Sequence, residues 1–258
     1  MTRDTSGMRR HLALGVVFGG SLVLMTNVAH AYRRRTVDDL PEGAPLFWER
    51  RTIEFRDEFT RIPDVETGAA RIALEASLAT WSHAGGCTDV LLTHSGQADA
   101  SRTNLSGGAP DMENRVVFRA TDWPLRVGPQ TLAVTTLIYR RASGEIVDAD
   151  IDINAVNHPW SALTAPAGTN DIENTLTHEF GHVLGFAHSD VREATMFAEA
   201  DLDETLKRDL ATDDVEAVCT VYPPRPTSTC TAAHGHSDFA WIGWLALAWL
   251  GRRRQRGC

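Results

Sequence analysis

The stretch that most constrains the fold is HEFGHVLGFAHS at residues 178–189, which combines three histidines, a glutamate and two glycines. On a helix, His178 and His182 lie four residues apart and project from one face, about one turn from each other. Gly185 can adopt the left-handed conformation that ends a helix, so the chain can turn back after it. His188 can then approach the other two imidazoles. The spacing therefore predicts a helix that ends near Gly185 with three histidines gathered beside it.

Three imidazoles can hold one zinc ion at about 2.0–2.1 Å and leave its fourth position open for water, which is typical of catalytic zinc. Glu179 follows the first histidine directly and can flank that position without binding the metal. Zinc lowers the pKa of its water to about 7, and a carboxylate within reach can accept the proton. We therefore predict one catalytic Zn²⁺ held by His178, His182 and His188. Glu179 is the predicted general base, which later returns the proton to the leaving amine.

Three other interpretations compete with a zinc endopeptidase acting on extracellular protein. The first is a helix whose histidines have no metal, although polar side chains so placed normally need partners. The second is a surface binding or adhesion module that keeps the fold without catalysis. The third is a zinc hydrolase acting on a small molecule or glycan, which would need a deep closed pocket. The presence of Glu179 favours the endopeptidase.

The same stretch resembles the metzincin peptidases and, within them, the matrixins of the bacterial kind. Met196 stands eight residues after His188 in ATMF, where the family has its Met-turn, an apolar floor beneath the metal ligands. Residues 210–222 (LATDDVEAVCTVY) resemble the family's closing helix with its paired aspartates. The resemblance spans residues 51–222. It implies an α+β fold with a mixed twisted sheet, an active-site helix and a C-terminal helix, and it gives Gly185 and Met196 supporting roles.

The resemblance also implies where a protein or peptide substrate would lie. An extended substrate would add antiparallel to the family's upper edge strand and be held mainly by main-chain hydrogen bonds. In this chain the place of that strand is taken by Leu132, Ala133, Val134 and Thr135. A plain edge strand without this role is the alternative.

One departure from the animal matrixins concerns additional metals. DADIDIN at residues 148–154 has Asp150 where those proteins carry a histidine for a structural zinc, so we expect no second zinc ion. Ca²⁺ ligands remain available at Asp148, Asp150 and Asp152. Alternate acidic residues on a solvated strand face are the simpler interpretation.

Two further departures concern specificity and latency. FAE at residues 197–199 replaces the Pro-x-Tyr segment that lines the family's specificity pocket, so the preferred side chain cannot be carried over. Residues 32–50 are shorter than the usual propeptide and contain no cysteine, which excludes a cysteine switch.

Periodicity and turn residues predict the other elements of a domain at residues 32–222. The predicted strands are 51–55, 89–92, 115–119, 132–140 and 145–154, with a Gly/Ser/Asn-rich loop at 95–114. The predicted helices are 65–83, 171–184 (capped by Asn170 or Asp171) and 212–222. Apolar residues near helical spacing in the first helix are Ala69, Ile72, Leu74, Ala76, Leu78 and Trp81. Helices before and after a block of strands favour a sheet with helices packed on it.

The N-terminal residues 1–31 have the pattern of a secretory signal peptide. Arg9 and Arg10 precede an apolar run at 12–25, and Ala-His-Ala at 29–31 provides a small-x-small cleavage site. A membrane anchor is the alternative, but the apolar run is short for one. We therefore expect an exported protein, extracellular or at the cell surface.

The C-terminal residues form a linker at 223–238, which contains Cys230, and a tail at 239–258. The tail's apolar run at 239–250 would span about 18 Å as a helix, against roughly 30 Å of membrane hydrocarbon, and arginines follow it. This order resembles the C-terminal sorting signals of myxobacterial surface proteins, in which the tail is cut near the cysteine. We expect anchoring at the cell surface or outer membrane; a short spanning helix is the alternative.

Cysteine usage and charge give two further expectations. Cys87 and Cys219 lie within the predicted domain, and export favours a disulfide between them over two free thiols. The formal net charge is −9, and no basic stripe interleaved with aromatic residues is present, so we expect no nucleic-acid partner.

Overall fold

The computed structural model describes residues 32–226 except 61, 83, 99–101 and 108–109. The expected signal peptide, Cys230 and the C-terminal tail lie outside the described residues. Nearly all of the described chain belongs to one compact unit that ends at Pro224. Within this part of the chain, no helix has both the length and the apolar character needed to cross a membrane.

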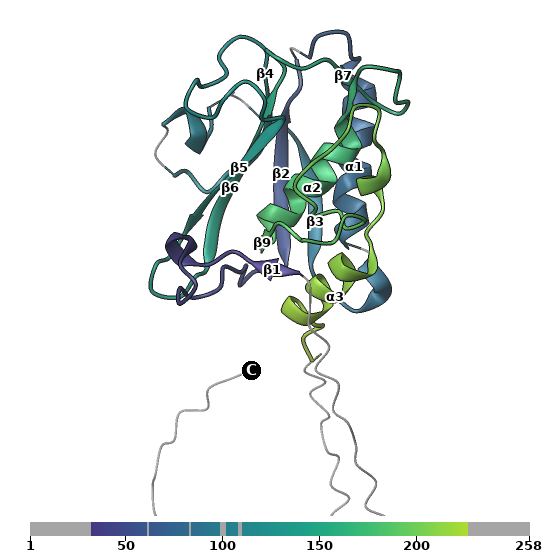
Figure 1. Cartoon of the computed structure of the whole chain (residues 1–258). Helices are drawn as coiled ribbons and strands as arrows, with labels where there is room; N and C mark the ends of the chain where they lie inside the picture. Colours follow the sequence, from purple (N-terminus) through teal and green to yellow (C-terminus); the bar gives the residue numbers. More distant parts are fainter. Residues whose placement is uncertain (1–31, 61, 83, 99–101, 108–109, 227–258) are drawn as a thin grey trace, which may run out of the picture. The chain divides into compact units, whose positions relative to one another are not determined.

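A five-stranded sheet with the strand order β3-β2-β4-β6-β5 forms the frame of the domain (Figure 1). β2 (Thr52–Glu58) pairs parallel with both β3 (Leu91–Gln97) and β4 (Asn114–Arg119). β4 pairs parallel with β6 (Ile146–Asn154), whereas β5 (Ala133–Tyr139) pairs antiparallel with β6 and lies at the edge. The expected mixed sheet and α+β class are confirmed. β5 contains three of the four residues expected on the substrate edge strand, and Leu132 precedes it directly.

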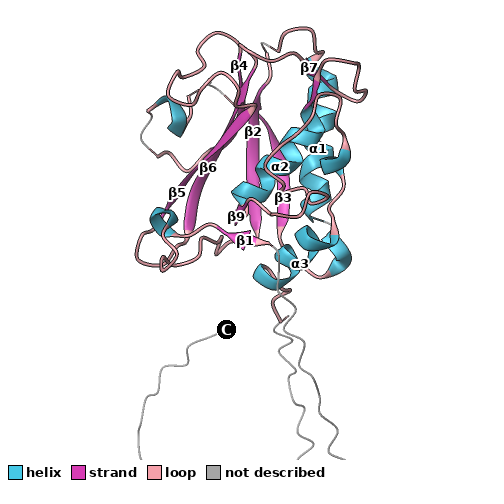
Figure 2. Cartoon of the chain, in the orientation of Figure 1, coloured by secondary structure: helices cyan, strands magenta, loops and turns pink. Residues whose placement is uncertain are grey.

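Three α-helices accompany the sheet (Figure 2). α1 (Thr67–Ser82) and α2 (Ile172–Val183) pack against each other and cover the same face of the sheet, and α3 (Thr212–Val221) follows near the end of the domain. Two short pairs were not expected from the sequence: β1 (Arg33–Arg34) with β9 (Phe186–Ala187), and β7 (Trp160–Ser161) with β8 (Asn170–Asp171). β3 also continues to Gln97, into the expected loop, because it pairs with β2 beyond a β-bulge.

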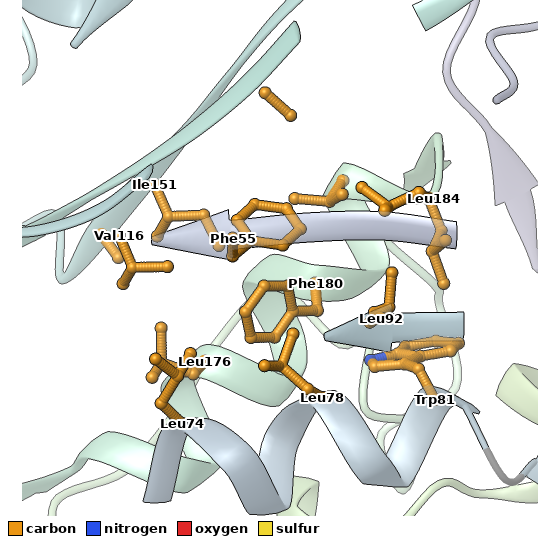
Figure 3. Packing of buried hydrophobic residues seen from close by; sticks show 14 of the residues in the cluster. Phe55, Leu74, Leu78, Trp81, Leu92, Val116, Ile151, Leu176, Phe180 and Leu184 are labelled. Atoms are coloured by element: carbon orange, nitrogen blue, oxygen red, sulfur yellow. The ribbon is translucent and has the colours of Figure 1, made fainter. Parts of the chain in front are cut away.

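The main core lies between the two packed helices and the sheet (Figure 3). Phe55 of β2 and Phe180 of α2 meet edge to face, with ring centroids 5.0 Å apart. Leu74, Leu78 and Trp81 point from α1 into the same cluster. The helix α2 is therefore held from two sides, by the sheet and by α1, which fixes the position of the histidines that it carries.

One residue of the expected helical pattern faces solvent. Ile72 is 55% exposed, whereas Ala70, Ala73 and Ser77 are buried. These small residues let α1 approach α2 closely, and the Ser77 hydroxyl is within hydrogen-bonding distance of the Glu173 carbonyl of α2 (3.2 Å). The buried face of α1 therefore combines small residues at the contact with α2 with Leu74, Leu78 and Trp81, and Ile72 lies outside it.

Cys87 and Cys219 form a disulfide that ties the segment after α1 to α3, with their Cα atoms 5.2 Å apart. The two cysteines are 132 residues apart in sequence. Closing so long a loop restricts the unfolded chain and stabilises the domain by about 2–4 kcal/mol.

Candidate metal centre and substrate cleft

The active-site helix α2 begins at a carboxylate cap. Asp171 accepts a hydrogen bond from the backbone N–H of Asn174 (2.8 Å), which satisfies one of the free donors of the first turn. Arg208 forms an ion pair with the same carboxylate. Of the two capping residues that the sequence offered, the structure uses Asp171.

The other end of α2 is held by residues that are distant in sequence. Gly185 has φ +85°, and a β-carbon on it would lie 2.6 Å from the Leu46 carbonyl oxygen. The indole N–H of Trp48 donates to the Val183 carbonyl (2.8 Å), and the Tyr222 hydroxyl donates to the Leu184 carbonyl (2.8 Å). The free carbonyls of the last turn therefore have donors, and the chain turns sharply towards His188.

The three histidines expected to bind metal converge at this turn. One ring nitrogen from each of His178, His182 and His188 lies within 4.8 Å of the other two. The Nε2 atoms of His182 and His188 are 3.2 Å apart. Three nitrogens at this separation can bind a single ion.

Two of the rings are oriented by backbone carbonyls. Nδ1 of His178 donates to the Thr195 carbonyl (2.7 Å), and Nδ1 of His182 donates to the Phe186 carbonyl (2.8 Å). Since a carbonyl only accepts, each Nδ1 carries the proton and each Nε2 is left free for a metal. Burial lowers the pKa of His178 well below its usual value and that of His182 to about 4. Neutral imidazoles with free Nε2 atoms are the donor set that zinc requires.

Glu179 lies beside the triad and is bound to the edge strand. Its Oε2 accepts a hydrogen bond from the Thr135 hydroxyl (2.6 Å), a contact that the sequence did not predict. Burial raises the pKa of Glu179 to about 7, while the hydrogen bond from Thr135 acts in the opposite direction. A carboxyl group with such a pKa can both accept and release a proton near neutrality.

Met196 packs beneath α2, next to the histidine triad. A β-carbon on Gly181 would lie 2.1 Å from the Met196 sulfur, so this side chain occupies the space that the glycine leaves. The backbone N–H groups of Thr195 and Met196 donate to the carboxylate of Asp214 in α3 (2.7 and 3.2 Å). The neighbouring Asp213 accepts from the Ser189 hydroxyl (2.7 Å). The paired aspartates therefore hold both the methionine turn and the segment after His188.

A cleft of about 870 Å³ extends to both sides of the triad. Its walls are the edge strand, including residues 130–135, and α2 with Glu179. Apart from residues 197–199, no local sequence pattern indicated the residues that line its two ends. At one end these are Arg34, Arg35, Thr36 and Asp39, and at the other they are Asn174, Thr175, the segment 197–200 and Lys207.

The acidic face of β6 is buried, so the expected solvated face is wrong. Asp148, Asp150 and Asp152 are at most 1% exposed, because the segment around Asn104 covers them. Asn104 donates its backbone N–H to Asp150 (2.8 Å) and its side-chain amide to Asp148 (3.0 Å). Arg119 pairs with Asp152 (2.6 Å). Burial raises the pKa of Asp150 to about 7.

These three carboxylates are mostly engaged by hydrogen-bond donors. Both oxygens of Asp150 accept backbone N–H groups, and both oxygens of Asp152 accept from the Thr103 hydroxyl. Of the six oxygens of these three carboxylates, only Oδ1 of Asp148 has no hydrogen-bond partner among the described residues. Ca²⁺ takes six to eight oxygen ligands, whereas most of these oxygens already accept hydrogen bonds from the protein. The arrangement is therefore typical of a buried hydrogen-bond network and not of a calcium site.

Residues 128–223 match the family model of the matrixins. This range contains the histidine triad, Glu179, Met196 and the paired aspartates. The domain therefore has a metzincin-like α+β fold, and the match together with the triad supports a metzincin-like, zinc-binding protease.

Curated relatives show the same likeness. Metalloendoproteinase 5-MMP of Arabidopsis thaliana is 31% identical over 38% of this chain and 30% of the relative. Matrix metalloproteinase-20 of Homo sapiens is 28% identical over 69% of this chain and 32% of the relative. Metalloendoproteinase 1-MMP of Arabidopsis thaliana is 43% identical over 22% of this chain and 15% of the relative. The matched part thus spans about a third or less of these relatives.

Proposed function

We propose that this protein is a zinc-dependent endopeptidase that hydrolyses peptide bonds of extracellular proteins. The observation that supports this most strongly is the position of the Glu179 carboxylate. It lies beside three converging histidines, in a cleft bounded by the edge of the sheet. The cleft extends to both sides of the triad, which favours a chain-like substrate over the small molecule or glycan of the alternative hypothesis.

The metal would be held by Nε2 of His178 and His182 and by a ring nitrogen of His188. When bound, zinc polarises the scissile carbonyl and makes an attacking water more acidic. The rings are already oriented by the carbonyls of Thr195 and Phe186, so little reorganisation is needed on binding. We assign no second zinc and no functional calcium to the aspartates of β6.

The substrate would lie antiparallel to β5. The backbone N–H of Asn154 donates to the Leu132 carbonyl (2.8 Å), so the main-chain groups of Leu132 face β6. The polar groups of successive residues in a strand point to opposite edges, and those of Ala133 and Thr135 therefore point to the free edge. These groups would hold the substrate main chain beside the triad.

Glu179 would carry the proton. Its Oε2 is held by the Thr135 hydroxyl, which leaves Oε1 to accept the proton of the attacking water. The same carboxyl group would then give that proton to the amine that leaves. Its position beside the triad and the cleft favours both steps.

Cleavage of casein by the zinc-loaded full-length protein tests this function. Glu179→Ala should lower the rate by about a thousandfold or more while zinc content, measured by elemental analysis, stays unchanged. Glu173→Gln, on the same helix, should leave the rate near that of wild type. If Glu179→Ala cleaves as fast as wild type, the assigned role is wrong. A wild-type protein that binds zinc but cleaves nothing would instead support the silent binding module.

We also propose export through residues 1–31, a peptidase domain at 32–222, and surface retention through the tail with Cys230. The Cys87–Cys219 disulfide supports an oxidising compartment. Cell fractionation of wild type and Cys230→Ser tests the anchoring: the variant should be released into the medium. Equal surface retention of both proteins would contradict a role of Cys230.

A further inference from the structure

Lys207 is the single lysine among the 25 lysine and arginine residues of the chain, and it lies in the cleft. It belongs to the short 3-10 helix η4 (Leu206–Arg208), which packs against α2. Its side chain is 4% exposed. Lysine presents a compact charge with three rotatable donors, whereas arginine presents a larger planar fork. A buried lysine in a chain that otherwise uses arginine indicates a position with a particular geometric requirement.

The end of the cleft that Lys207 occupies can be assigned a direction. At the opposite end, the backbone N–H of Asp38 donates to the Tyr139 hydroxyl (3.0 Å), which places the N-terminal segment at the C-terminal end of β5. Asn174, which binds the Lys207 backbone, lies in the first turn of α2, whereas Arg35 binds Gly185 beyond its last turn. Lys207 therefore lies at the other end of the cleft, towards the N-terminal end of β5. For a substrate antiparallel to β5, this end receives the residue that follows the cleaved bond.

Among the described residues, the floor of this end has hydrogen-bond donors without an acceptor. The Lys207 ammonium donates to the Glu199 carbonyl (2.7 Å) and to the Glu204 carboxylate. Among the described residues, no acceptor is present for its third N–H. Asn174 is partly engaged, since its Oδ1 accepts from the Lys207 backbone (2.7 Å) and one N–H of its amide points to Glu204 at 3.5 Å. The pocket floor is therefore polar, because the Lys207 ammonium lines it and is itself paired with the Glu204 carboxylate.

An aliphatic, an acidic and an amide side chain of a substrate would interact differently with this floor. An aliphatic side chain would cover the third N–H and leave it without a partner, which is unfavourable in a buried site. A carboxylate would meet the ammonium but also the carboxylate of Glu204, so the buried group would carry a net negative charge. A neutral amide avoids both costs, because its oxygen accepts from Lys207 without adding a charge to the Lys207–Glu204 pair.

We propose that Lys207 is a specificity-determining residue that selects substrates with glutamine directly after the cleaved bond. This inference rests on the proposed peptidase function and on the antiparallel position of the substrate. The walls beside the floor are formed by Thr175 and by the segment 197–200, which contains two alanines.

Four peptides that differ only at this residue test the proposal, with Gln, Glu, Met or Leu at the position. For wild type, kcat/KM for the Gln peptide should exceed that for the Met and Leu peptides by about tenfold. Lys207→Met should reverse this order. Glu204→Gln should raise the relative rate for the Glu peptide, because it removes the like charge. A wild-type preference for Leu, or ratios unchanged by both substitutions, would overturn the proposal.

A binding experiment separates this proposal from the proposed catalysis. Zinc-loaded Glu179→Ala should bind the Gln peptide about tenfold more tightly than the Leu peptide, and Lys207→Met in the same background should abolish the difference. Equal affinities would refute the role of Lys207 even if wild type cleaves both peptides. Absence of cleavage by wild type would refute the peptidase function instead. If Lys207→Met does not fold, Glu204→Gln still decides between the outcomes.

Discussion

The sulfur of Met196 occupies the space beside α2 that the absence of a side chain at Gly181 leaves open. A β-carbon on Gly181 would lie 2.1 Å from this sulfur and 2.9 Å from Cζ2 of Trp81. Gly181 stands between Glu179 and His182 in sequence, so the apolar floor approaches the helix next to the groups that carry the chemistry. The glycine of the motif is therefore a packing requirement.

Substitution of Gly181 by alanine should destabilise the domain by about 1–3 kcal/mol and weaken zinc binding, because Met196 must move. Urea unfolding and zinc titration measure the two effects. Gly68→Ala in α1 is a matched control, since a β-carbon there meets nothing within 4 Å. This control should stabilise the protein by about 0.4–1 kcal/mol. A Gly181→Ala protein as stable as wild type would show that the methionine floor is mobile.

The Thr135 hydroxyl should set the pH range of catalysis through Glu179. Its hydrogen bond favours the charged carboxylate and so lowers the pKa of Glu179 against the effect of burial. Removing it with Thr135→Val should raise this pKa. The general base must be deprotonated, so the acidic limb of the pH profile of kcat/KM should move to higher pH. At pH 6, kcat/KM of the variant should be about tenfold lower than that of wild type.

Thr135→Ser keeps the hydroxyl and should retain the wild-type pH profile. Activity lost equally at all pH values in Thr135→Val would indicate a role in substrate positioning alone.

The metal centre could be predicted because its signal is local. His178 and His182 share one helix face, Glu179 flanks it, and Gly185 marks the turn to His188, so spacing alone constrains their geometry. Lys207 and Arg35 are brought to the cleft by tertiary contacts, and no spacing of residues in the sequence indicates these contacts. The use of a single lysine was a compositional signal that could have drawn attention to Lys207.

The acidic face of β6 shows a second limit of sequence reasoning. Alternating aspartates produce the same pattern whether water or another segment covers them. Asn104 and Thr103, which cover them here, lie more than forty residues earlier in the chain. Burial of Asp150 therefore depends on a loop whose path cannot be derived from local propensity.

This burial should make stability depend on pH through Asp150. Its folded pKa of about 7 is above the ordinary value of 3.8, so the folded state binds the proton more tightly than the unfolded state. The contribution to stability is fully present below pH 3.8 and is lost as pH rises towards 7. The loss should be on the order of 2–4 kcal/mol, and Asp150→Asn should lack it.

Urea unfolding of wild type and Asp150→Asn at pH values between 4 and 8 measures the difference. Asp122→Asn is a control, because Asp122 is largely exposed and pairs with the same Arg119. Its difference from wild type should be flat across this range. A flat difference for Asp150→Asn as well would show that this carboxyl group is charged in the folded protein.

The N-terminal segment should contribute to zinc affinity through Trp48, although this residue lies far from the triad in sequence. Its indole N–H donates to the Val183 carbonyl, one residue after His182, so it holds the turn that brings His188 to the other ligands. Trp48→Phe should weaken zinc binding by about tenfold or more. Trp123→Phe is a matched control, because it removes an equivalent hydrogen bond to the Gly128 carbonyl (2.9 Å) in the loop before β5. Both variants should be less stable than wild type. In a zinc titration, only Trp48→Phe should bind zinc more weakly. Equal zinc affinity in the two variants would mean that the turn holds its shape without Trp48.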